Sequence, residues 1–493
     1  MNLSFLNRLE ALLRLVPHVK KPHEPLTFRQ KLKWTAIIMG LYFILFSTPA
    51  FGVNKTTLEN PVFQLLNIVF ASRTGTLITV GISPIVLASI VLQFLQGAEL
   101  LKIDMNNPYE KGKFQTIQKS AAIVIALVES VIFAHSLPLL SPSFFTIVAA
   151  QLAIGAIIVI YLDETMVKYG ITSGINLFIA GGVAYAIVAG TINILILGAI
   201  GQIQSGAWAG SNLLPNVLLA FGSLFFAILV MLICIYVYDI KIELPLAFSQ
   251  ARGVGGRLPI PFLYVSVLPV ILASSLIAST TLWFSFLSGV TGQYANLAHF
   301  IGYYTVTGNG AAGGTTKALS GGLLYLISPT FNIGEPYPPP YGIGYGDYFN
   351  NLIAGISPLY MPWGGVVYVP EWVHIITYTI VLIILCIIFG KFWVEMTGQS
   401  PKNMADQLQS IGWQIPGFRR DPRIIESILN KYIPTITVLG SIVVALLAAL
   451  ANLTGAIGTG MGILLTVGIM YMVYRQLEQE NVIESSGLEK YIS

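Results

Sequence analysis

Residue types that commonly do covalent or metal chemistry are few and far apart in this chain. Its two cysteines, Cys234 and Cys386, both lie inside apolar runs, which gives no disulfide framework. The glycine-rich stretch Arg252–Arg257 lacks the Gly-Lys-Ser/Thr ending of a phosphate-binding loop. No nucleophile stands in a pattern with a base, so we expect no enzyme, no metal and no cofactor. The histidines, which show none of the spacings of metal ligands, are His18, His23, His135, His299 and His374.

One carboxylate, Glu129, falls in the middle of a long apolar run. An ionisable side chain inside a membrane is costly, and its presence usually signals function. A single carboxylate that faces another helix can also be structural, and we favour the structural role for Glu129.

The composition is that of a polytopic membrane protein. The 493 residues are 55% hydrophobic and 10% charged, with a mean hydropathy of +0.75, which excludes a soluble globular protein. A helix needs about 20 apolar residues to cross a bilayer core. The sequence therefore predicts an all-α fold with ten transmembrane helices. They are expected near 33–51, 76–97, 116–136, 143–162, 173–200, 213–238, 259–286, 371–393, 433–452 and 458–477.

The distribution of Lys and Arg residues predicts the orientation of these ten segments in the membrane. With the N-terminus inside, all but three of the 26 Lys and Arg residues fall on the inner side; the exceptions are Lys55, Arg73 and Lys317. Such an asymmetry follows the positive-inside rule and places both termini in the cytoplasm. The first 32 residues are basic and contain no apolar core, so we expect a cytosolic segment with an amphipathic helix or a disordered tail over Phe5–Val16.

Five segments on each side of the middle give two halves of opposite orientation, the topology of an inverted repeat. The predicted halves are residues 33–200 and 213–480, joined by an outer hinge loop at 201–212. The cytosolic N-terminal segment is 1–32 and the cytosolic tail is 481–493. We assign no role to the long outer loop 287–370, whose stretch Leu319–Ile327 is apolar enough to touch the membrane surface.

The outer stretch 52–75 contains a short apolar helix that begins at Asn60-Pro61. About ten apolar residues make a helix of about 15 Å, half the thickness of the bilayer core. Such a half-helix either lies on the outer surface or folds back into the protein beside a cavity.

Two inner loops, 239–258 and 394–432, are basic. Their cations either hold the topology against anionic lipids or bind an acidic or nucleic-acid partner. Composition alone favours the first role.

Several motifs in colinear order resemble the SecY family of protein-conducting channels. The similarity covers residues 27–480 and has an archaeal character. The motifs are Thr74–Val86, Tyr161–Ile175, Ile242–Ala247 with Arg252-Gly253 and Leu258–Ser266, Pro269–Ala273, Phe392–Gly398, and Gly417–Arg420.

The resemblance implies an hourglass pore between the two halves, closed by a ring of aliphatic side chains and by the half-helix as a plug. The implied ring residues are Ile82, Val86, Ile175, Ile179, Ile271 and Leu465. The implied plug residues are Pro61, Val62, Phe63, Leu65, Leu66, Ile68, Val69 and Phe70. An apolar constriction blocks ions by dewetting, and its flexible side chains can part around a polypeptide.

The resemblance also implies a lateral gate at Leu87 and Ser279 that releases transmembrane segments sideways into lipid. At these two positions the family often has Thr and Asn, so this chain departs from its pattern. Ribosome docking is implied for Arg252, Arg257, Arg419 and Arg420.

The expected function is that of the central translocon subunit, in the plasma membrane. Its expected partners are a SecE-type subunit, a SecG or beta-type small subunit, the ribosome, secretory and membrane-protein nascent chains, and membrane lipids. The alternative is a secondary transporter of a small solute on the same inverted repeat, although such a protein should carry polar groups at its midplane. A membrane scaffold for ribosomes or nucleic acid is a weaker third interpretation.

Overall fold

The structure is a computed structural model that describes most of the chain. The described residues are 17–20, 22, 26–54, 67, 70–97, 108–192, 213–248, 255–265, 267–284, 294–307, 316–329, 353–411, 413–414, 422–454, 456 and 460–479.

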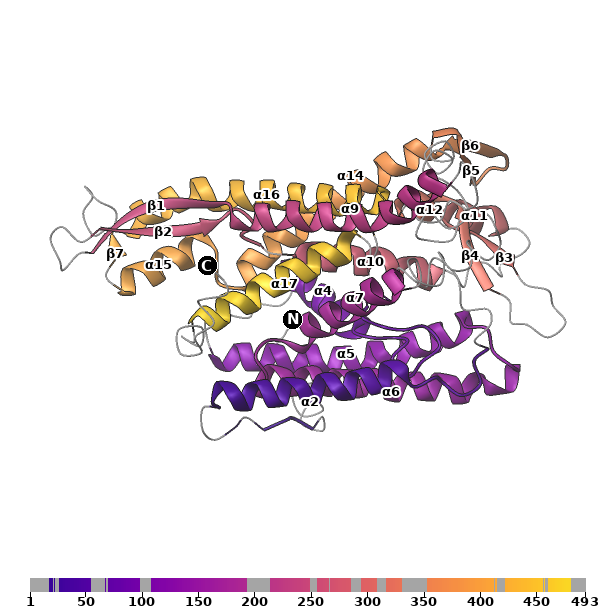
Figure 1. Cartoon of the computed structure of the whole chain (residues 1–493), viewed down its shortest axis with the longest axis horizontal. Coiled ribbons are helices and arrows are strands. Elements are labelled where there is room, and N and C mark those ends of the chain that lie inside the picture. The colour runs from indigo at the N-terminus through magenta and orange to yellow at the C-terminus, as the bar shows by residue number, and fades with distance from the viewer. Residues whose placement is uncertain are drawn as a thin grey trace.

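Five helices of the first half form one packed group. They are α2 (Phe28–Ser47), α4 (Ser83–Gly97), α5 (Pro108–Ser136), α6 (Phe145–Tyr169, after the 3-10 turn Pro142–Phe144) and α7 (Gly174–Ile192). Helix α5 packs between α4 and α6, and α6 also contacts α2 and α7. In Figure 1 this group, coloured indigo to magenta, occupies the lower part of the molecule.

Five helices of the second half form the other group. They are α9 (Leu213–Asp239), α10 (Leu268–Phe284), α14 (Glu371–Met396), α16 (Pro422–Leu453) and α17 (Gly460–Gln479). Helix α14 packs between α10 and α16, and α17 lies against α16 and α9. The two groups meet chiefly along α7 with α17 and α4 with α10, and α5 with α10 and α4 with α14 make smaller contacts. The first four helices surround the centre of the molecule (Figure 1).

The helices are apolar enough for a membrane protein with several spans. Four described stretches are each long and apolar enough to cross a membrane: Gly112–Ser136, Pro142–Tyr169, Glu371–Gln409 and Ile425–Leu453. Five further apolar helices are shorter, at Ser83–Gln96, Gly174–Ala189, Leu224–Asp239, Leu268–Phe284 and Gly462–Arg475. The expected number of ten crossings stays a prediction.

Two predicted spans begin later than expected. The segment predicted from residue 76 forms turns until α4 starts at Ser83, where Pro84 fits the first helical turn. The segment predicted from residue 259 is strand until Pro261, and α10 starts only at Leu268. Proline disfavours helical backbone at the residue before it, which explains the extended Leu258-Pro-Ile-Pro261 run.

The fold is mostly helical, as predicted, and the loops add three small antiparallel sheets among the described residues. The inner loops form one sheet of order β2-β1-β7 from β1 (Lys241–Phe248), β2 (Gly255–Pro261) and β7 (Trp413–Gln414). The long loop 287–370 contains two hairpins, β3 (Tyr303–Thr307) with β4 (Thr316–Gly321), and β5 (Ile356–Tyr360) with β6 (Val366–Pro370). Three short helices complete the loops: α11 (Ala295–Ile301), α12 (Leu323–Ile327) and α15 (Pro401–Ile411).

The stretch Leu319–Ile327, which is apolar enough to touch the membrane surface, packs mostly inward. Leu319, Leu324 and Tyr325 are buried together in a small core beneath the hairpins, and of this stretch Leu323 is exposed. The Tyr304 hydroxyl donates to the Thr281 carbonyl at 2.6 Å, which fastens this core to the end of α10.

A short piece of the N-terminal segment lies against the ends of α5 and α6. Lys119 Nζ donates to the Pro17 carbonyl at 2.5 Å, and the Tyr169 hydroxyl donates to the Lys20 carbonyl at 2.9 Å. Lys119 is also paired with Glu164 at 2.5 Å. The amphipathic helix predicted over Phe5–Val16 lies outside the described residues.

Candidate functional site

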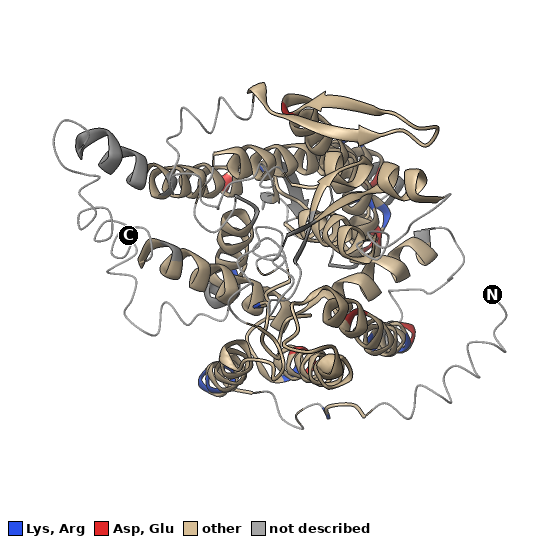
Figure 2. Cartoon of the chain, turned by 90° about the vertical axis from the view of Figure 1, so that its right-hand side faces the viewer, with Lys and Arg blue, Asp and Glu red and all other residues tan. Residues whose placement is uncertain are grey.

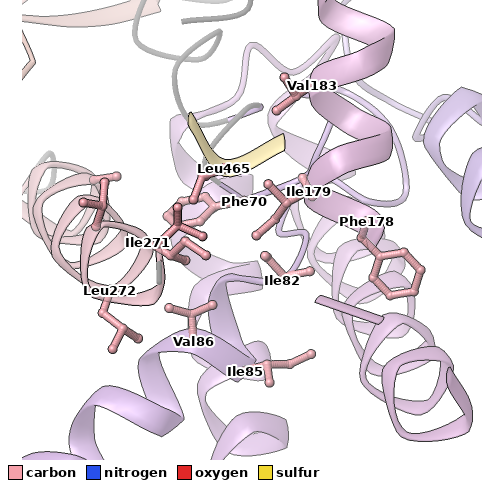
Figure 3. Close-up of a cluster of buried hydrophobic side chains, with 14 of the residues drawn as sticks. Phe70, Ile82, Ile85, Val86, Phe178, Ile179, Val183, Ile271, Leu272 and Leu465 are labelled. Atoms are coloured by element: carbon pink, nitrogen blue, oxygen red, sulfur yellow. The ribbon is translucent and has the colours of Figure 1, made fainter. Parts of the chain in front are cut away.

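The predicted ring residues come together at the centre of the molecule, between the two helix groups. Ile82 lies in the turn before α4, Ile179 in α7, Ile271 in α10 and Leu465 in α17. These side chains are almost fully buried and belong to one hydrophobic core. In Figure 3 they point toward one another, whereas Phe178 on α7 and Leu272 on α10 point away.

The two remaining ring residues lie one turn from this meeting point. Val86 is buried in the first turn of α4, and its N–H donates to the Ile82 carbonyl at 3.2 Å. Ile175 is half-buried at the start of α7, one turn before Ile179, and packs against the same core. The two members of each pair, Ile82 with Val86 and Ile175 with Ile179, therefore lie one helical turn apart as predicted, although Ile82 precedes the first residue of α4.

Phe70, the last of the predicted plug residues, inserts into this ring. Its side chain is fully buried, and Figure 3 shows it beside Leu465 and Ile271. The Ile82 N–H donates to the Phe70 carbonyl at 2.9 Å. This close approach requires Gly81, which has φ +59° and whose added Cβ would stand 2.1 Å from the Phe70 carbonyl oxygen. The other predicted plug residues lie outside the described part of the chain: Pro61, Val62, Phe63, Leu65, Leu66, Ile68 and Val69.

Polar contacts that the sequence analysis missed hold the end of this segment in place. The Asn67 side-chain oxygen accepts from the Thr74 N–H and the Thr74 hydroxyl, both at 2.7 Å. The buried Tyr42 hydroxyl of α2 donates to the Ala71 carbonyl at 2.5 Å, and its ring stacks on Phe178 at 4.5 Å. An Asn within the apolar run 62–71 was the sequence signal for this anchor.

An aspartate fixes where α7 begins and thus where its ring residues lie. Asp163 Oδ1 accepts from the Ile175 N–H at 2.9 Å, which satisfies a free donor at the helix N-terminus. Gly174 is needed beside it, since an added Cβ would stand 2.7 Å from the Asp163 Cα. Asp163 belongs to the motif Tyr161–Ile175, but the motif alone did not reveal this role.

A buried polar network joins α4, α5 and α10. The Ser83 hydroxyl donates to Glu129 Oε1 at 2.8 Å, and Ser83 Oγ lies 3.5 Å from Ser279 Oγ. Ser279, predicted for the lateral gate, therefore faces α4, and the mid-span Glu129 shares its network. Leu87, the other predicted gate residue, is buried on α4. Sequence reasoning missed Ser83, which stands at the start of α4 next to Pro84.

The two basic inner loops are parts of one folded unit. Ile260, Val265, Leu408 and Ile425, from the sheet region, α15 and α16, share a buried cluster. The Tyr264 hydroxyl donates to the Gln399 carbonyl at 2.8 Å, and burial raises the pKa of Tyr264 to about 12, so it remains a donor.

The sheet brings together the strand ends that flank the predicted docking segments. Ala247 and Phe248 at the end of β1 pair with Gln414 and Trp413 of β7, so the chain leaves for both basic loops from the same place. Arg257 lies in β2 opposite Pro245. Arg252, Arg419 and Arg420 lie outside the described residues. Within the described part of the chain, no group of three or more His, Cys, Asp or Glu residues is placed to hold a metal ion.

Two groups of apolar helices around a buried aliphatic ring, with a short segment inserted into it, define a class of helical membrane channels. The family model SecY matches residues 76–474. The protein translocase subunit SecY of Methanococcus vannielii is 38% identical over 485 residues, which are 97% of each chain.

Two solved channels have the same fold. A SecY structure concerned with the plug domain in the closed channel has a TM-score of 0.72 and 35% identity, over 97% of this chain and 98% of that one. Sec61 in the canine ribosome–channel complex of the endoplasmic reticulum has a TM-score of 0.71 and 33% identity, over the same shares of both chains.

The chain belongs to the SecY family. It is a multi-pass membrane protein and the channel-forming subunit of a protein translocase, which passes polypeptides across the membrane. The alternative of a small-solute transporter is not supported.

Proposed function

We propose that Ile82, Val86, Ile175, Ile179, Ile271 and Leu465 are the constriction through which polypeptides pass. The observation that carries this proposal is the convergence of aliphatic side chains from four helices on Phe70 (Figure 3). Such a ring offers water and ions no hydrogen bonds, so it excludes them without a covalent or catalytic step. A polypeptide halted in transit should touch these side chains, and a photoreactive residue at Ile179 that never crosslinks to it would overturn the assignment.

The segment that ends at Phe70 acts as the plug of the resting channel. Phe70 fills the centre of the ring, and a polypeptide can enter only when this side chain has left. The plug domain of the related SecY structure stabilises the closed channel, which supports the same role here. The hydrogen bonds of Asn67 with Thr74, of Tyr42 with Ala71 and of Ile82 with Phe70 then hold this segment in the ring of the resting channel.

Ser83, Glu129 and Ser279 hold the lateral gate closed between α4 and α10. Removing a hydrogen-bond partner from a buried polar group costs about 1–3 kcal/mol, so Ser83→Ala, which leaves Glu129 Oε1 without this donor, should shift the gate toward its open state. We expect this variant to accept signal segments that are less apolar than those the unsubstituted channel requires. The measurement is translocation into reconstituted vesicles of one secretory polypeptide that carries a graded series of signal sequences.

The matched control for the gate is Ser274→Ala. Ser274 is also buried on α10, but its hydroxyl donates within its own helix to the Val270 and Ile271 carbonyls. An equal gain in permissiveness in both variants would show that the effect comes from general loosening of α10, and the gate assignment would be wrong.

The inner sheet unit docks the ribosome through Arg252, Arg257, Arg419 and Arg420. Two observations support this proposal. The strand ends from which both basic loops begin are paired with each other, and the related Sec61 channel is found in a ribosome–channel complex. We expect Arg257→Glu to weaken ribosome binding and its salt dependence, as loss of a phosphate contact does. Arg29→Glu, the same charge change at the exposed start of α2, should leave both unchanged, and equal losses would contradict the proposal.

The chain lies in the plasma membrane with both termini in the cytoplasm, beside a SecE-type subunit and a SecG or beta-type subunit. The distribution of Lys and Arg supports this orientation. Its halves, 33–200 and 213–480, are related as inverted repeats. A tag at either terminus should be cleaved by added protease only when the cytoplasmic face is accessible. Purification of the chain from the membrane should also bring down two small single-span proteins.

A further inference from the structure

The β5–β6 hairpin presents an unusually apolar and aromatic surface for a loop. Trp363 at its turn is 81% exposed. Further large apolar side chains are exposed along the hairpin and at the start of α14: Ile356, Val366, Val367, Tyr368 and Trp372. In Figure 2 the hairpin is the ribbon pair at the top, along the rim of the helix bundle.

No charged residue interrupts this surface. Residues 353–370 contain no Asp, Glu, Lys or Arg, and Figure 2 shows the hairpin without a blue or red residue. The first charged residue after it, Glu371, is turned inward and buried. Its two carboxylate oxygens contact the Tyr325 hydroxyl and His374 Nδ1, each at 3.0 Å. The one charge at the junction of hairpin and helix is therefore removed from the surface.

The exposed surface of the hairpin continues directly into that of α14. Helix α14 begins at Glu371, immediately after β6, and belongs to a stretch that is long and apolar enough to cross a membrane. Trp372, Ile376, Ile380, Ile384 and Ile388 are exposed at every fourth residue along it. Consecutive residues with this spacing are neighbours on the helix surface, so the five form a stripe that winds slowly around α14 and faces lipid in a membrane protein.

The middle of β5 and its end next to the turn are held by contacts, whereas the tip of the turn, residues 363–365, is exposed. Tyr360 packs its ring against Tyr303 at 4.6 Å and His299 at 5.3 Å, and the Gly322 N–H donates to the Pro358 carbonyl at 3.2 Å. At the turn, Gly364 and Gly365 have φ +91° and +109°, and an added Cβ on either would meet nothing within 4 Å. The protein thus holds β5 against the outer region and leaves the Trp363 side chain at the tip of the turn exposed.

We propose that the β5–β6 hairpin is a membrane anchor whose Trp363 turn lies in the interfacial layer of the bilayer, beside the outer end of α14. Tyr and Trp are the residues that favour this layer, because their rings are amphipathic. The outer edges of a two-stranded hairpin carry free backbone groups, which suits the interfacial layer with its polar headgroups and not the hydrocarbon core. A hairpin held in the interface at one end of α14 ties the outer region, and through Tyr304 the end of α10, to the membrane surface.

The test places an environment-sensitive nitrobenzoxadiazole probe on Trp363→Cys in the full chain, reconstituted into phosphatidylcholine–phosphatidylglycerol vesicles. Labelling of the unsubstituted chain sets the background from Cys234 and Cys386, which are buried. The expected result is blue-shifted emission that is quenched by lipids brominated near the headgroup end of the acyl chain, with little quenching by aqueous iodide.

The matched control is Asn296→Cys, an exposed polar position on α11 in the same outer region. Its probe should be quenched by iodide and not by brominated lipid. Iodide quenching at position 363 without lipid quenching would place the turn in water and overturn the proposal. Blue-shifted emission that neither quencher reaches would mean that protein covers the turn, and this outcome would overturn it as well.

Discussion

Vesicles that contain the Ile271→Asn variant are expected to leak ions through the resting channel. Ile271 lies in the closed ring and is buried among Ile82, Ile179 and Leu465. A buried amide without a partner costs about 1–3 kcal/mol, which favours entry of water to satisfy it. This corresponds to about a ten- to hundredfold rise in the wetted population, measured as ion conductance across a planar bilayer.

Leu272→Asn is the matched control for this experiment. Leu272 is the next residue on α10 and is also buried, but it points away from the ring (Figure 3). It should destabilise the protein as much as Ile271→Asn without raising the conductance. Equal leakage in the two variants would mean that general loosening of α10 causes the leak and that Ile271 does not seal the channel.

Oxidation of an Ala71→Cys, Gly182→Cys double variant is expected to stop export. A Cβ built on Gly182 of α7 stands 3.8 Å from the Ala71 Cβ, the usual separation across a disulfide. The bond would tether the residue next to Phe70 to α7, so the plug could not leave the ring. Translocation of a secretory polypeptide into vesicles should be lost on oxidation and restored by dithiothreitol.

The two single-cysteine variants control for effects of each substitution. Both should export equally with and without oxidant. Export by the oxidised double variant at the rate of the reduced form, with the disulfide shown by a mobility shift, would contradict the assigned plug.

The apolar runs predicted where each long helix lies, because each span needs a continuous apolar length, but they did not predict every end: α5 and α16 begin well before their apolar runs, at Pro108 and Pro422. The segment predicted at 213–238 is α9, Leu213–Asp239, and that predicted at 458–477 is α17, Gly460–Gln479. The predictions failed where local backbone rules override hydropathy. Residues 76–82 are apolar enough for a helix but form turns around Gly81, and the prolines at 259 and 261 hold β2 extended.

Contacts between distant residues could not be read from a single sequence. Ser83 and Glu129 are 46 residues apart, and Ser83 and Ser279 are 196 apart, so nothing local pairs them. The ring residues became candidates only through the family motifs, since an Ile in an apolar helix looks the same in a core and in a pore. The β5–β6 hairpin carries a local signal in Gly364-Gly365, but the sequence analysis treated residues 287–370 only as an outer loop without a role.

The most direct test of the account is site-specific photocrosslinking to a secretory nascent chain stalled on the ribosome. Photoreactive residues at Ile82, Ile179 and Leu465 are compared with one at Glu129 and one at Tyr294, an exposed tyrosine of the outer region. The account predicts strong crosslinks from the three ring positions and none from the controls. Absence of ring crosslinks, with the ribosome bound and the small subunits present, would contradict the assigned polypeptide path.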